Sequence, residues 1–290
     1  MTSLIDAVRE RVVVLDGGLA TELERRGNDL SSVLWSARLL RDDPDEIVAA
    51  HRAFAAAGAE VAITASYQVS FERLGDDAQM LLRRSVELAR RAGQDWVAAS
   101  VGPYGAMLAD GSEYRGDYGR SVAELRRFHR RRLGVLAETD ADVLAVETIP
   151  CLAEVEAVLA ELDDLGAPAW LSLSCVGRWT RAGEPAEEAF AMARDCPAVF
   201  AVGVNCTAPA DVSDLVALAI ARSGKPAVAY PNSGELWDAA RRVWSGRSAF
   251  DPTDVQVWIG EGARLVGGCC RVGPADVAAI AEVVRRRLGR

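Results

Sequence analysis

Short apolar runs alternate with longer amphipathic segments along the whole chain. The apolar runs fall at 12–15, 60–64, 96–101, 142–147, 169–174, 199–206, 227–232 and 264–268. Each run has the length of a strand and is apolar throughout, which is typical of parallel strands buried on both faces. The pattern therefore predicts eight parallel strands.

A helical pattern lies between successive strands. The clearest start is at Asp43, a favoured N-cap residue that precedes Pro44, and Gly58 marks the end of that helix. Further helices are expected at 77–92, 121–139, 152–165, 185–194, 210–222, 252–262 and after Pro274. Eight such units predict the α/β class and a single (β/α)₈ TIM barrel over residues 1–290. An open doubly wound sheet is the alternative, but no Gly-rich dinucleotide turn is present.

The segment 102–119, after the third run, has no regular periodicity. A stretch of this length in a compact domain usually serves a function or lacks order. It contains polar and aromatic residues at Tyr104, Asp110, Glu113, Tyr114, Arg115, Asp117 and Tyr118. A lid or substrate wall is the preferred interpretation, and a mobile surface loop is the alternative.

Composition limits the environment and the partners. Half of the residues are hydrophobic, 26% are charged and the formal net charge is −9, as expected of a globular protein. No basic block could follow a phosphate backbone, so nucleic acid is not expected as a partner. The N-terminus lacks a signal-peptide pattern and no apolar run approaches the length of a membrane span, which predicts a cytoplasmic protein. Its six cysteines are therefore expected to be reduced.

Three of these cysteines follow predicted strands. Cys206 ends the sixth run, and the adjacent Cys269 and Cys270 follow the eighth. A disulfide between neighbouring cysteines requires a strained eight-membered ring, and strands six and eight are only two apart in a barrel. Three thiolates with one open position favour Zn²⁺. The alternatives are small buried hydrophobic residues and a redox dithiol, which the absence of a C-x-x-C motif disfavours.

The ligand set indicates which reaction such a zinc ion would support. Three thiolates leave the site with a charge of −1, so the ion would activate water poorly. It would still lower the pKa of a coordinating thiol, whose sulfur would remain electron-rich. This chemistry favours alkyl transfer to a thiol over hydrolysis.

Two acidic residues also stand at predicted strand ends. Asp16 and Glu147 could act as acid and base, or could bind a substrate ammonium group while backbone N–H groups near Gly17, Gly18 and Ser66 bind its carboxylate. Capping of a loop is the structural alternative for each acid. The two histidines, His51 and His129, are expected to be structural, and Lys225 precedes strand seven at the wrong end of the barrel for a Schiff base.

Several motifs together resemble the zinc-dependent homocysteine S-methyltransferases. They are Asp16-Gly17-Gly18 with 21–23, the segment 63–68, Val204-Asn205-Cys206, and Gly267-Gly268-Cys269-Cys270-Arg271. The segments 100–106, 110–118 and 230–235 are similar to the branch that uses S-methylmethionine or S-adenosylmethionine. The betaine-using branch is less similar, and the cobalamin-dependent enzymes carry additional modules.

The resemblance implies roles for individual residues. Cys206, Cys269 and Cys270 would bind zinc, and Asp16 and Glu147 would hold the amino group of homocysteine. The turn from Thr64 to Ser66 would lie near this amino acid, and Asn232 matches a position that can supply an oxygen ligand when substrate is absent.

The implied reaction transfers a methyl group from a sulfonium donor to homocysteine and forms methionine. Tyr114, Tyr118 and Trp237 are candidates for cation–π contact with the donor, with ordinary loop packing as the alternative. Two rival functions stay open: a zinc-binding or thiol-redox barrel without methyl transfer, and a methyltransferase that uses selenohomocysteine or another thiol. The sequence does not predict an oligomeric state.

Overall fold

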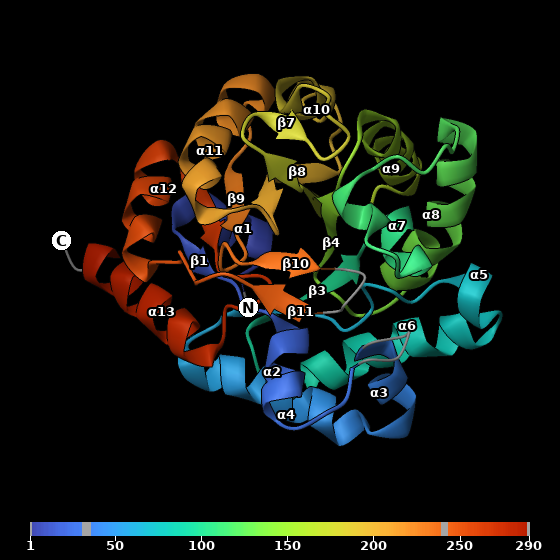
Figure 1. The fold of residues 1–290 in the computed structure, drawn as a ribbon, viewed down its shortest axis with the longest axis horizontal. Coiled ribbons are helices and arrows are strands. Elements are labelled where there is room, and N and C mark those ends of the chain that lie inside the picture. The colour runs from blue at the N-terminus through green and yellow to red at the C-terminus, as the bar shows by residue number, and fades with distance from the viewer. Residues whose placement is uncertain (1, 31–35, 239–242, 289–290) are drawn as a thin grey trace.

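The computed structural model describes residues 2–30, 36–238 and 243–288. Eight parallel strands form one sheet in the order β1-β12-β9-β8-β5-β4-β3-β2. The bounds are β1 (Val13–Val14), β2 (Val61–Ile63), β3 (Trp96–Val101), β4 (Val143–Ile149), β5 (Ala169–Leu173), β8 (Val199–Asn205), β9 (Ala227–Tyr230) and β12 (Ala263–Val266). A parallel bridge between Leu15 and Val61 joins β1 to β2, so the sheet closes into a barrel, as predicted (Figure 1).

Helices surround this barrel (Figure 1). They are α1 (Leu4–Glu10), α2 (Leu19–Arg25), α3 (Ser36–Asp42), α4 (Pro44–Ala57), α5 (Phe71–Leu74), α6 (Asp77–Arg90), α7 (Tyr104–Leu108), α8 (Val122–Ala137), α9 (Leu152–Leu165), α10 (Ala186–Met192), α11 (Pro209–Ser223), α12 (Val255–Glu261) and α13 (Pro274–Leu288). Helix α4 begins at Pro44 and ends at Gly58 in the left-handed region, as predicted. The short helices α1, α2, α3, α5 and α7 were not predicted, because four to seven residues give few turns of periodicity. Helices α10 and α12 also have seven residues each, but they lie within predicted helices between successive strands.

Alternate strand residues pack on opposite sides of the barrel wall. Val13 and Leu15 belong to the cluster inside the barrel, whereas Val12 and Val14 belong to the cluster between barrel and helices. Both faces of each strand are therefore buried, which explains why the runs are apolar throughout.

Helix α1 covers the amino ends of the strands. Its residues Leu4 and Val8 pack in the interior cluster, and the indole Nε1 of Trp96, at the start of β3, donates to the carbonyl oxygen of Thr2. The opposite end, where the strands have their carboxyl termini, remains available for function.

The irregular segments contain more regular structure than the sequence predicted. The stretch 102–119 folds into α7 and a 3₁₀ helix, η1 (Ser112–Tyr114). Two antiparallel hairpins project from the barrel, β6 (Cys175–Val176) with β7 (Trp179–Thr180) and β10 (Leu236–Asp238) with β11 (Val243–Ser245). Residues 252–262 form a second 3₁₀ helix, η2 (Pro252–Asp254), followed by α12.

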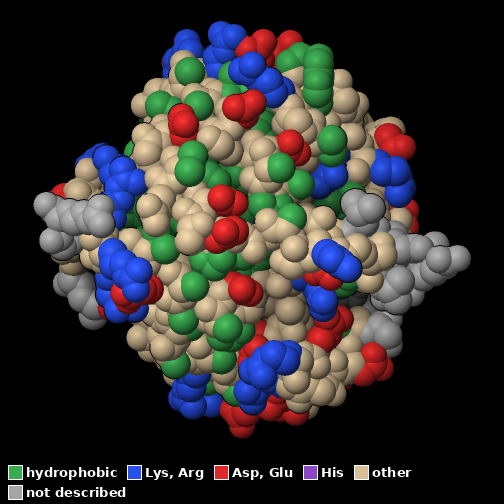
Figure 2. Space-filling view, turned by 60° about the vertical axis from the view of Figure 1, so that its left-hand side comes forward, with side chains coloured by type: hydrophobic (Ala, Val, Ile, Leu, Met, Phe, Trp, Pro, Cys, Tyr) green, Lys and Arg blue, Asp and Glu red, His purple; other side chains and the backbone are tan. Residues whose placement is uncertain are grey.

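The surface carries mixed charge. On the face shown in Figure 2, Lys and Arg side chains lie in separate groups among Asp and Glu side chains. In the C-terminal helix, Arg285 and Arg286 pair with Glu282 on an exposed face. Within the described ranges, no helix combines the length and apolar character that crossing a membrane requires.

Candidate functional site

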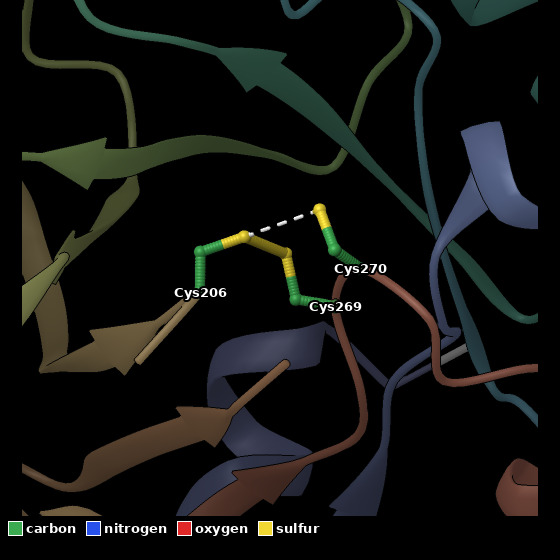
Figure 3. Close-up of side chains that lie close together, drawn as sticks. All are labelled: Cys206, Cys269 and Cys270. Atoms are coloured by element: carbon green, nitrogen blue, oxygen red, sulfur yellow. Dashed lines mark hydrogen bonds between the residues drawn. A yellow bond between two sulfur atoms is a disulfide. The ribbon is translucent and has the colours of Figure 1, made fainter. Parts of the chain in front are cut away.

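Three cysteines converge at the carboxyl end of the barrel. Cys206 directly follows β8, and Cys269 and Cys270 follow β12, with β9 between these strands. The three sulfur atoms all lie within 4.8 Å of one another, and the Sγ atoms of Cys206 and Cys270 are 3.5 Å apart (Figure 3). The prediction that barrel closure unites the ends of strands six and eight is confirmed.

A tight turn after β12 places the cysteine pair. The N–H group of Gly268 donates to the carbonyl of Asp16 at 3.0 Å, and the N–H group of Cys269 donates to the carbonyl of Pro231 at 2.7 Å. A Cβ atom at Gly268 would come within 2.1 Å of Cγ1 of Val272. Only glycine fits this close approach, so the Gly-Gly sequence allows the chain to fold back over the barrel mouth.

The redox state differs from the expected one. Cys206 and Cys269 form a disulfide, whereas Cys151, Cys175, Cys196 and Cys270 are free. The expectation that all six cysteines are reduced is thus wrong for two of them. The bridge joins the ends of β8 and β12, which lie on either side of β9, so the ring strain of a bridge between Cys269 and Cys270 does not arise.

The cysteine cluster can hold a metal ion once the bridge is reduced. Three thiolates suit a soft or borderline ion such as Zn²⁺, whose bonds to sulfur are about 2.3 Å long. The Nδ2 group of Asn205 lies 3.8 Å from Sγ of Cys269, and the hydroxyl of Tyr114 lies 3.8 Å from Sγ of Cys206. Hydrogen-bond donors next to the sulfur atoms of a metal site orient those sulfurs toward the ion. Burial raises the pKa of Cys270 to about 11, so a bound cation is needed for it to be a thiolate at neutral pH.

Two buried carboxylates face the same cavity as the cysteines. Oδ2 of Asp16 accepts a hydrogen bond from the N–H group of Ile63 at 2.8 Å, while its Oδ1 has no partner among the described residues. Oε1 of Glu147 accepts a hydrogen bond from the hydroxyl of Ser100. Burial raises the pKa of Asp16 well above its usual value and that of Glu147 to about 7. Both carboxylates would therefore be stabilised by a cationic ligand.

The raised pKa of Glu147 makes stability depend on pH. In the unfolded chain this carboxyl ionises near its ordinary value, whereas in the folded chain it keeps its proton up to about pH 7. The folded state therefore binds more protons across this window, and its stability falls as pH rises through it. For the metal-free protein, the free energy of unfolding is expected to decrease by on the order of 2–3 kcal/mol from this one group between pH 4.5 and 8.

Urea denaturation of the metal-free protein at several pH values measures this effect. The variant Glu147→Gln has no carboxyl group at this position, so its stability is expected to decrease less over the same range. Parallel pH profiles for wild type and variant would contradict the assignment of this titration to Glu147.

Most of the predicted site residues line one cavity. They are Asp16, Gly17, Gly18, Thr64, Glu147, Cys206, Cys269 and Cys270. Ser66 and Asn232 are not among its lining residues. The hydroxyl of Ser66 lies 2.7 Å from that of Thr64 and donates to the carbonyl of Ser100, so Ser66 supports the wall from behind.

Asn232 lines a separate cavity beside the first. Its Oδ1 accepts a hydrogen bond from the N–H group of Gly234 at 2.9 Å, which fixes this amide within its own turn. Tyr114 lines both cavities. A role of Asn232 as an oxygen ligand to the metal stays a prediction.

The backbone near Gly18 is less available than expected. Its N–H group donates to the carbonyl of Val272 at 2.9 Å, and Gly18 is the N-cap residue of α2. This N–H group is thus not free to bind a substrate carboxylate. Sequence reasoning did not foresee this bond, because Val272 is more than 250 positions away.

Several cavity residues were not singled out as functional from the sequence. Ser100 holds Glu147, and Asn205 clamps Thr148 through bonds of 2.7 Å to its N–H group and to its hydroxyl. Thr148 has a φ of 60°, an unusual conformation for a residue with a branched side chain. Their positions in the sequence could have identified them, because Asn205 immediately precedes Cys206 and Thr148 immediately follows Glu147.

The aromatic candidates separate in space. Tyr114 lines the cavity with the cysteines, whereas Tyr118 packs against Tyr104 with ring centroids 5.4 Å apart. Trp237 belongs to β10, and its side chain lies outside what the structure describes. Of the two candidates whose side chains the structure describes, Tyr114 is the one that lies next to the thiols.

The histidines and the lysine have the structural positions expected of them. His51 is buried 4.0 Å from Asp16, and burial lowers its pKa to about 4, so it is neutral near pH 7. His129 is hydrogen-bonded to Glu154 at 2.8 Å. Lys225 donates to the carbonyls of Cys196 and Val199 at the amino end of β8, far from the barrel mouth.

Comparison with known proteins gives a consistent result. A family model described as homocysteine S-methyltransferase matches residues 13–284. The chain is 44% identical to homocysteine S-methyltransferase 4 of Zea mays, over 94% of this chain and 89% of that protein. It is 42% identical to selenocysteine Se-methyltransferase of Brassica oleracea var. italica, over 94% and 89% of the two chains.

A solved structure matches the fold closely. The homocysteine methyltransferase MmuM of Escherichia coli in its metallated form superposes with a TM-score of 0.83 at 39% identity, covering 94% of this chain and 96% of that one. Its oxidized form superposes with a TM-score of 0.84 at 38% identity, covering 97% and 98%.

Proposed function

This chain belongs to the homocysteine S-methyltransferase family and is a methyltransferase, and we propose that Cys206, Cys269 and Cys270 bind the zinc ion at which it activates homocysteine. The observation that carries this proposal is a single cavity lined by three converging cysteines and two buried carboxylates. The disulfide would be the oxidised, metal-free state of the same three-cysteine site. In the reducing cytoplasm, where we place the enzyme, the thiols would be available.

The zinc ion would supply one specific property. When bound by three thiolates, it lowers the pKa of a fourth sulfur ligand while leaving that sulfur nucleophilic. The three cysteines would hold the ion at the mouth of the barrel, and Asn205 and Tyr114 would orient two of their sulfurs.

The carboxylates would seat the amino-acid end of homocysteine. Asp16 has an unpartnered Oδ1, and Glu147 is held in place by Ser100. A substrate ammonium group would lower the pKa of both acids by restoring a charge partner. Thr64 and Gly17 line the cavity and would be available for the substrate carboxylate, whereas the N–H group of Gly18 is occupied.

The methyl donor would be a sulfonium compound. The thiolate sulfur of homocysteine forms a bond to the methyl carbon, and the bond from that carbon to the donor sulfur breaks with its electron pair left on the donor sulfur. S-methylmethionine and S-adenosylmethionine both carry such a group. The sulfur of the product methionine is a neutral thioether. It lacks the negative charge that would hold the homocysteine thiolate on zinc.

A parallel comparison of donors tests this function. The reduced, zinc-loaded enzyme is expected to form methionine from homocysteine with S-methylmethionine or S-adenosylmethionine, and at least about 100-fold more slowly with betaine. A quaternary ammonium nitrogen releases its methyl group less readily than a sulfonium sulfur does. Initial rates are measured by chromatographic detection of methionine, with omission of homocysteine as the control. An enzyme that turns over with neither sulfonium donor would refute the proposal.

A second acceptor is favoured by one comparison. The relative from Brassica oleracea is named a selenocysteine Se-methyltransferase at 42% identity. Selenocysteine could use the same ammonium contacts with Asp16 and Glu147. Homocysteine remains the first proposal, and competition between the two acceptors in one reaction mixture would rank them.

A further inference from the structure

Glu113 is a third carboxylate in the wall of the central cavity. It lies in η1, its exposed fraction is only 3%, and it lines the same cavity as Asp16, Glu147 and the cysteines. Neither homocysteine binding nor the metal site, as proposed above, uses it. A buried carboxylate without a charged or hydrogen-bonding partner lowers the stability of the folded protein, because burial penalises its charged form.

The surrounding backbone holds Glu113 in this position. Oδ1 of Asp110 accepts hydrogen bonds from both the N–H group and the hydroxyl of Ser112. A Cβ atom at Gly105, in α7, would lie 2.4 Å from the backbone nitrogen of Glu113, so η1 packs directly on the backbone of α7. The N–H group of Tyr114 donates to the carbonyl of Gly111 and completes the turn. A hydrogen-bonded turn that packs on α7 therefore fixes the position of Glu113 in the cavity wall.

One oxygen of this carboxylate lacks a partner. Its Oε2 is buried and has no hydrogen-bond partner within the described parts of the chain. Burial raises its pKa to about 7, against a hydrogen bond from its own backbone and a weaker effect of the charge of Arg115, which both lower it. Arg115 is exposed and pairs with Asp117 at 3.2 Å, so it does not cover the buried oxygen.

The cavity is rich in groups that can carry negative charge. Among the described residues that line it are three carboxylates and three cysteines, and no Lys, Arg or His. A metal ion would be the cationic partner of the thiolates, and the homocysteine ammonium would be the cationic partner of Asp16 and Glu147. Glu113 then remains as the one acid to which neither the metal nor homocysteine supplies a partner.

Glu113 lies on the aromatic side of the cavity. Burial is the main cause that raises the pKa of Tyr67 and Tyr114, and the charge of Glu113 adds to the rise in both. Both tyrosines line the cavity. The hydroxyl of Tyr114 is 3.8 Å from Sγ of Cys206. A cation that approaches the thiols along this wall would pass the side chains of Tyr67 and Tyr114 and one carboxylate. The guanidinium of Arg181 already lies over the Tyr114 ring, 5.3 Å from its centroid.

We propose that Glu113 is the residue that recognises the positive charge of the methyl donor. The inference rests on the proposed function, because it requires a sulfonium substrate. Methyl transfer converts the donor cation and the homocysteine thiolate into two neutral thioethers, so the attraction to Glu113 exists for the reactant and disappears in the product. Glu113 is thus a specificity-determining residue that strengthens donor binding and lets the spent donor leave.

The kinetic consequence is a separation of KM from kcat. An interaction that weakens as the charge is neutralised stabilises the bound donor more than the transition state. The variant Glu113→Gln, which keeps the shape and removes the charge, is expected to raise KM for the sulfonium donor at least about 10-fold with kcat changed less than about 3-fold. KM for homocysteine and the zinc content are expected to stay as in wild type.

The affinities of the enzyme for two unreactive analogues of the donor measure the effect of the positive charge on binding, without turnover. One analogue replaces the dimethylsulfonium group of S-methylmethionine with trimethylammonium, and the other replaces it with the neutral tert-butyl group of the same shape. Wild-type enzyme, loaded with zinc, is expected to bind the cation at least about 10-fold more tightly than the neutral analogue in calorimetry. In Glu113→Gln this preference is expected to approach unity.

Two further variants control the experiment. Asp117→Asn removes one negative charge from the same segment, but Asp117 is exposed and pairs with Arg115, so the preference for the cation should persist. Glu113→Asp keeps the charge on a shorter side chain and should retain part of the preference. If Glu113→Gln loses zinc or folds poorly, Glu113→Asp still tests whether the carboxylate carries the effect.

The outcomes separate this inference from the proposed function. Absence of turnover by wild-type enzyme with any sulfonium donor overturns the proposed function itself. Normal turnover by wild type together with an unchanged preference for the cation in Glu113→Gln overturns only the role of Glu113. A variant with reduced kcat and an unchanged donor KM would also overturn it, since that pattern indicates an interaction made only in the transition state.

Discussion

Replacing Cys206 by serine is expected to abolish both metal binding and methyl transfer. Cys206 is the only one of the three clustered cysteines that comes from β8, so its loss leaves two adjacent ligands on one turn. A serine hydroxyl is a poor ligand for an ion that selects thiolates. The loss in rate should exceed the roughly 10- to 100-fold effect that is typical of residues behind the ligands.

Metal analysis and activity are measured on the same reduced preparation. Zinc content is expected to fall from about one equivalent to near zero, in step with the rate of methionine formation. Treatment of wild type with a zinc chelator should give the same loss, and addition of zinc should restore activity only to wild type. Cys196→Ser is the matched control, because Cys196 is also buried but lies before β8 at the opposite end of the barrel.

Two results would contradict this prediction. Full activity of wild type after complete removal of metal would exclude the proposed zinc chemistry. Loss of activity in Cys206→Ser with zinc fully retained would show that Cys206 acts as a thiol and not as a ligand.

Replacing Glu147 by glutamine is expected to weaken homocysteine binding and to leave the metal in place. Glutamine keeps an oxygen for the hydroxyl of Ser100 but cannot pair with an ammonium group. Hydrogen bonds to charged groups contribute about 1.5–3 kcal/mol, which corresponds to an increase of about 10- to 150-fold in KM for homocysteine. Steady-state kinetics with saturating donor and zinc analysis measure the two expectations.

This variant separates methyl transfer from the rival function. A zinc-storing or redox-sensing barrel would retain the three cysteines without needing Glu147, so the substitution would have no functional effect in that case. Glu161→Gln is the matched control. Glu161 is also buried, but it pairs with Arg126 and Arg130 between α8 and α9. Its loss should affect stability and not the KM for homocysteine.

The redox state of the cluster connects these predictions. The same cysteines that would hold the metal include the disulfide pair Cys206 and Cys269, with Cys270 3.5 Å from Cys206. A thiolate that is consumed in a disulfide cannot ligate zinc. Activity therefore requires reduction before metal loading, and the order of these two additions matters in every assay described above.

The sequence by itself determined the eight strands, their order and one helix after each strand. Apolar runs and amphipathic periods are local properties, and only one closed arrangement of eight β/α units brings all the strand ends to one rim. For the same reason the sequence placed Asp16, Glu147 and the three cysteines together. Their positions at strand ends were sufficient for this prediction, because closure of the barrel brings the carboxyl ends of all strands close together.

Only the tertiary structure decided which loop groups face the cavity and which are occupied. Ser66 supports the wall from behind, Asn232 turns into a neighbouring cavity, and the N–H group of Gly18 donates to Val272. Glu113 lies in a segment without periodicity, and its burial depends on the packing of η1 on Gly105. These outcomes follow from contacts between distant segments or from irregular turns, and neither leaves a repeating pattern in the sequence.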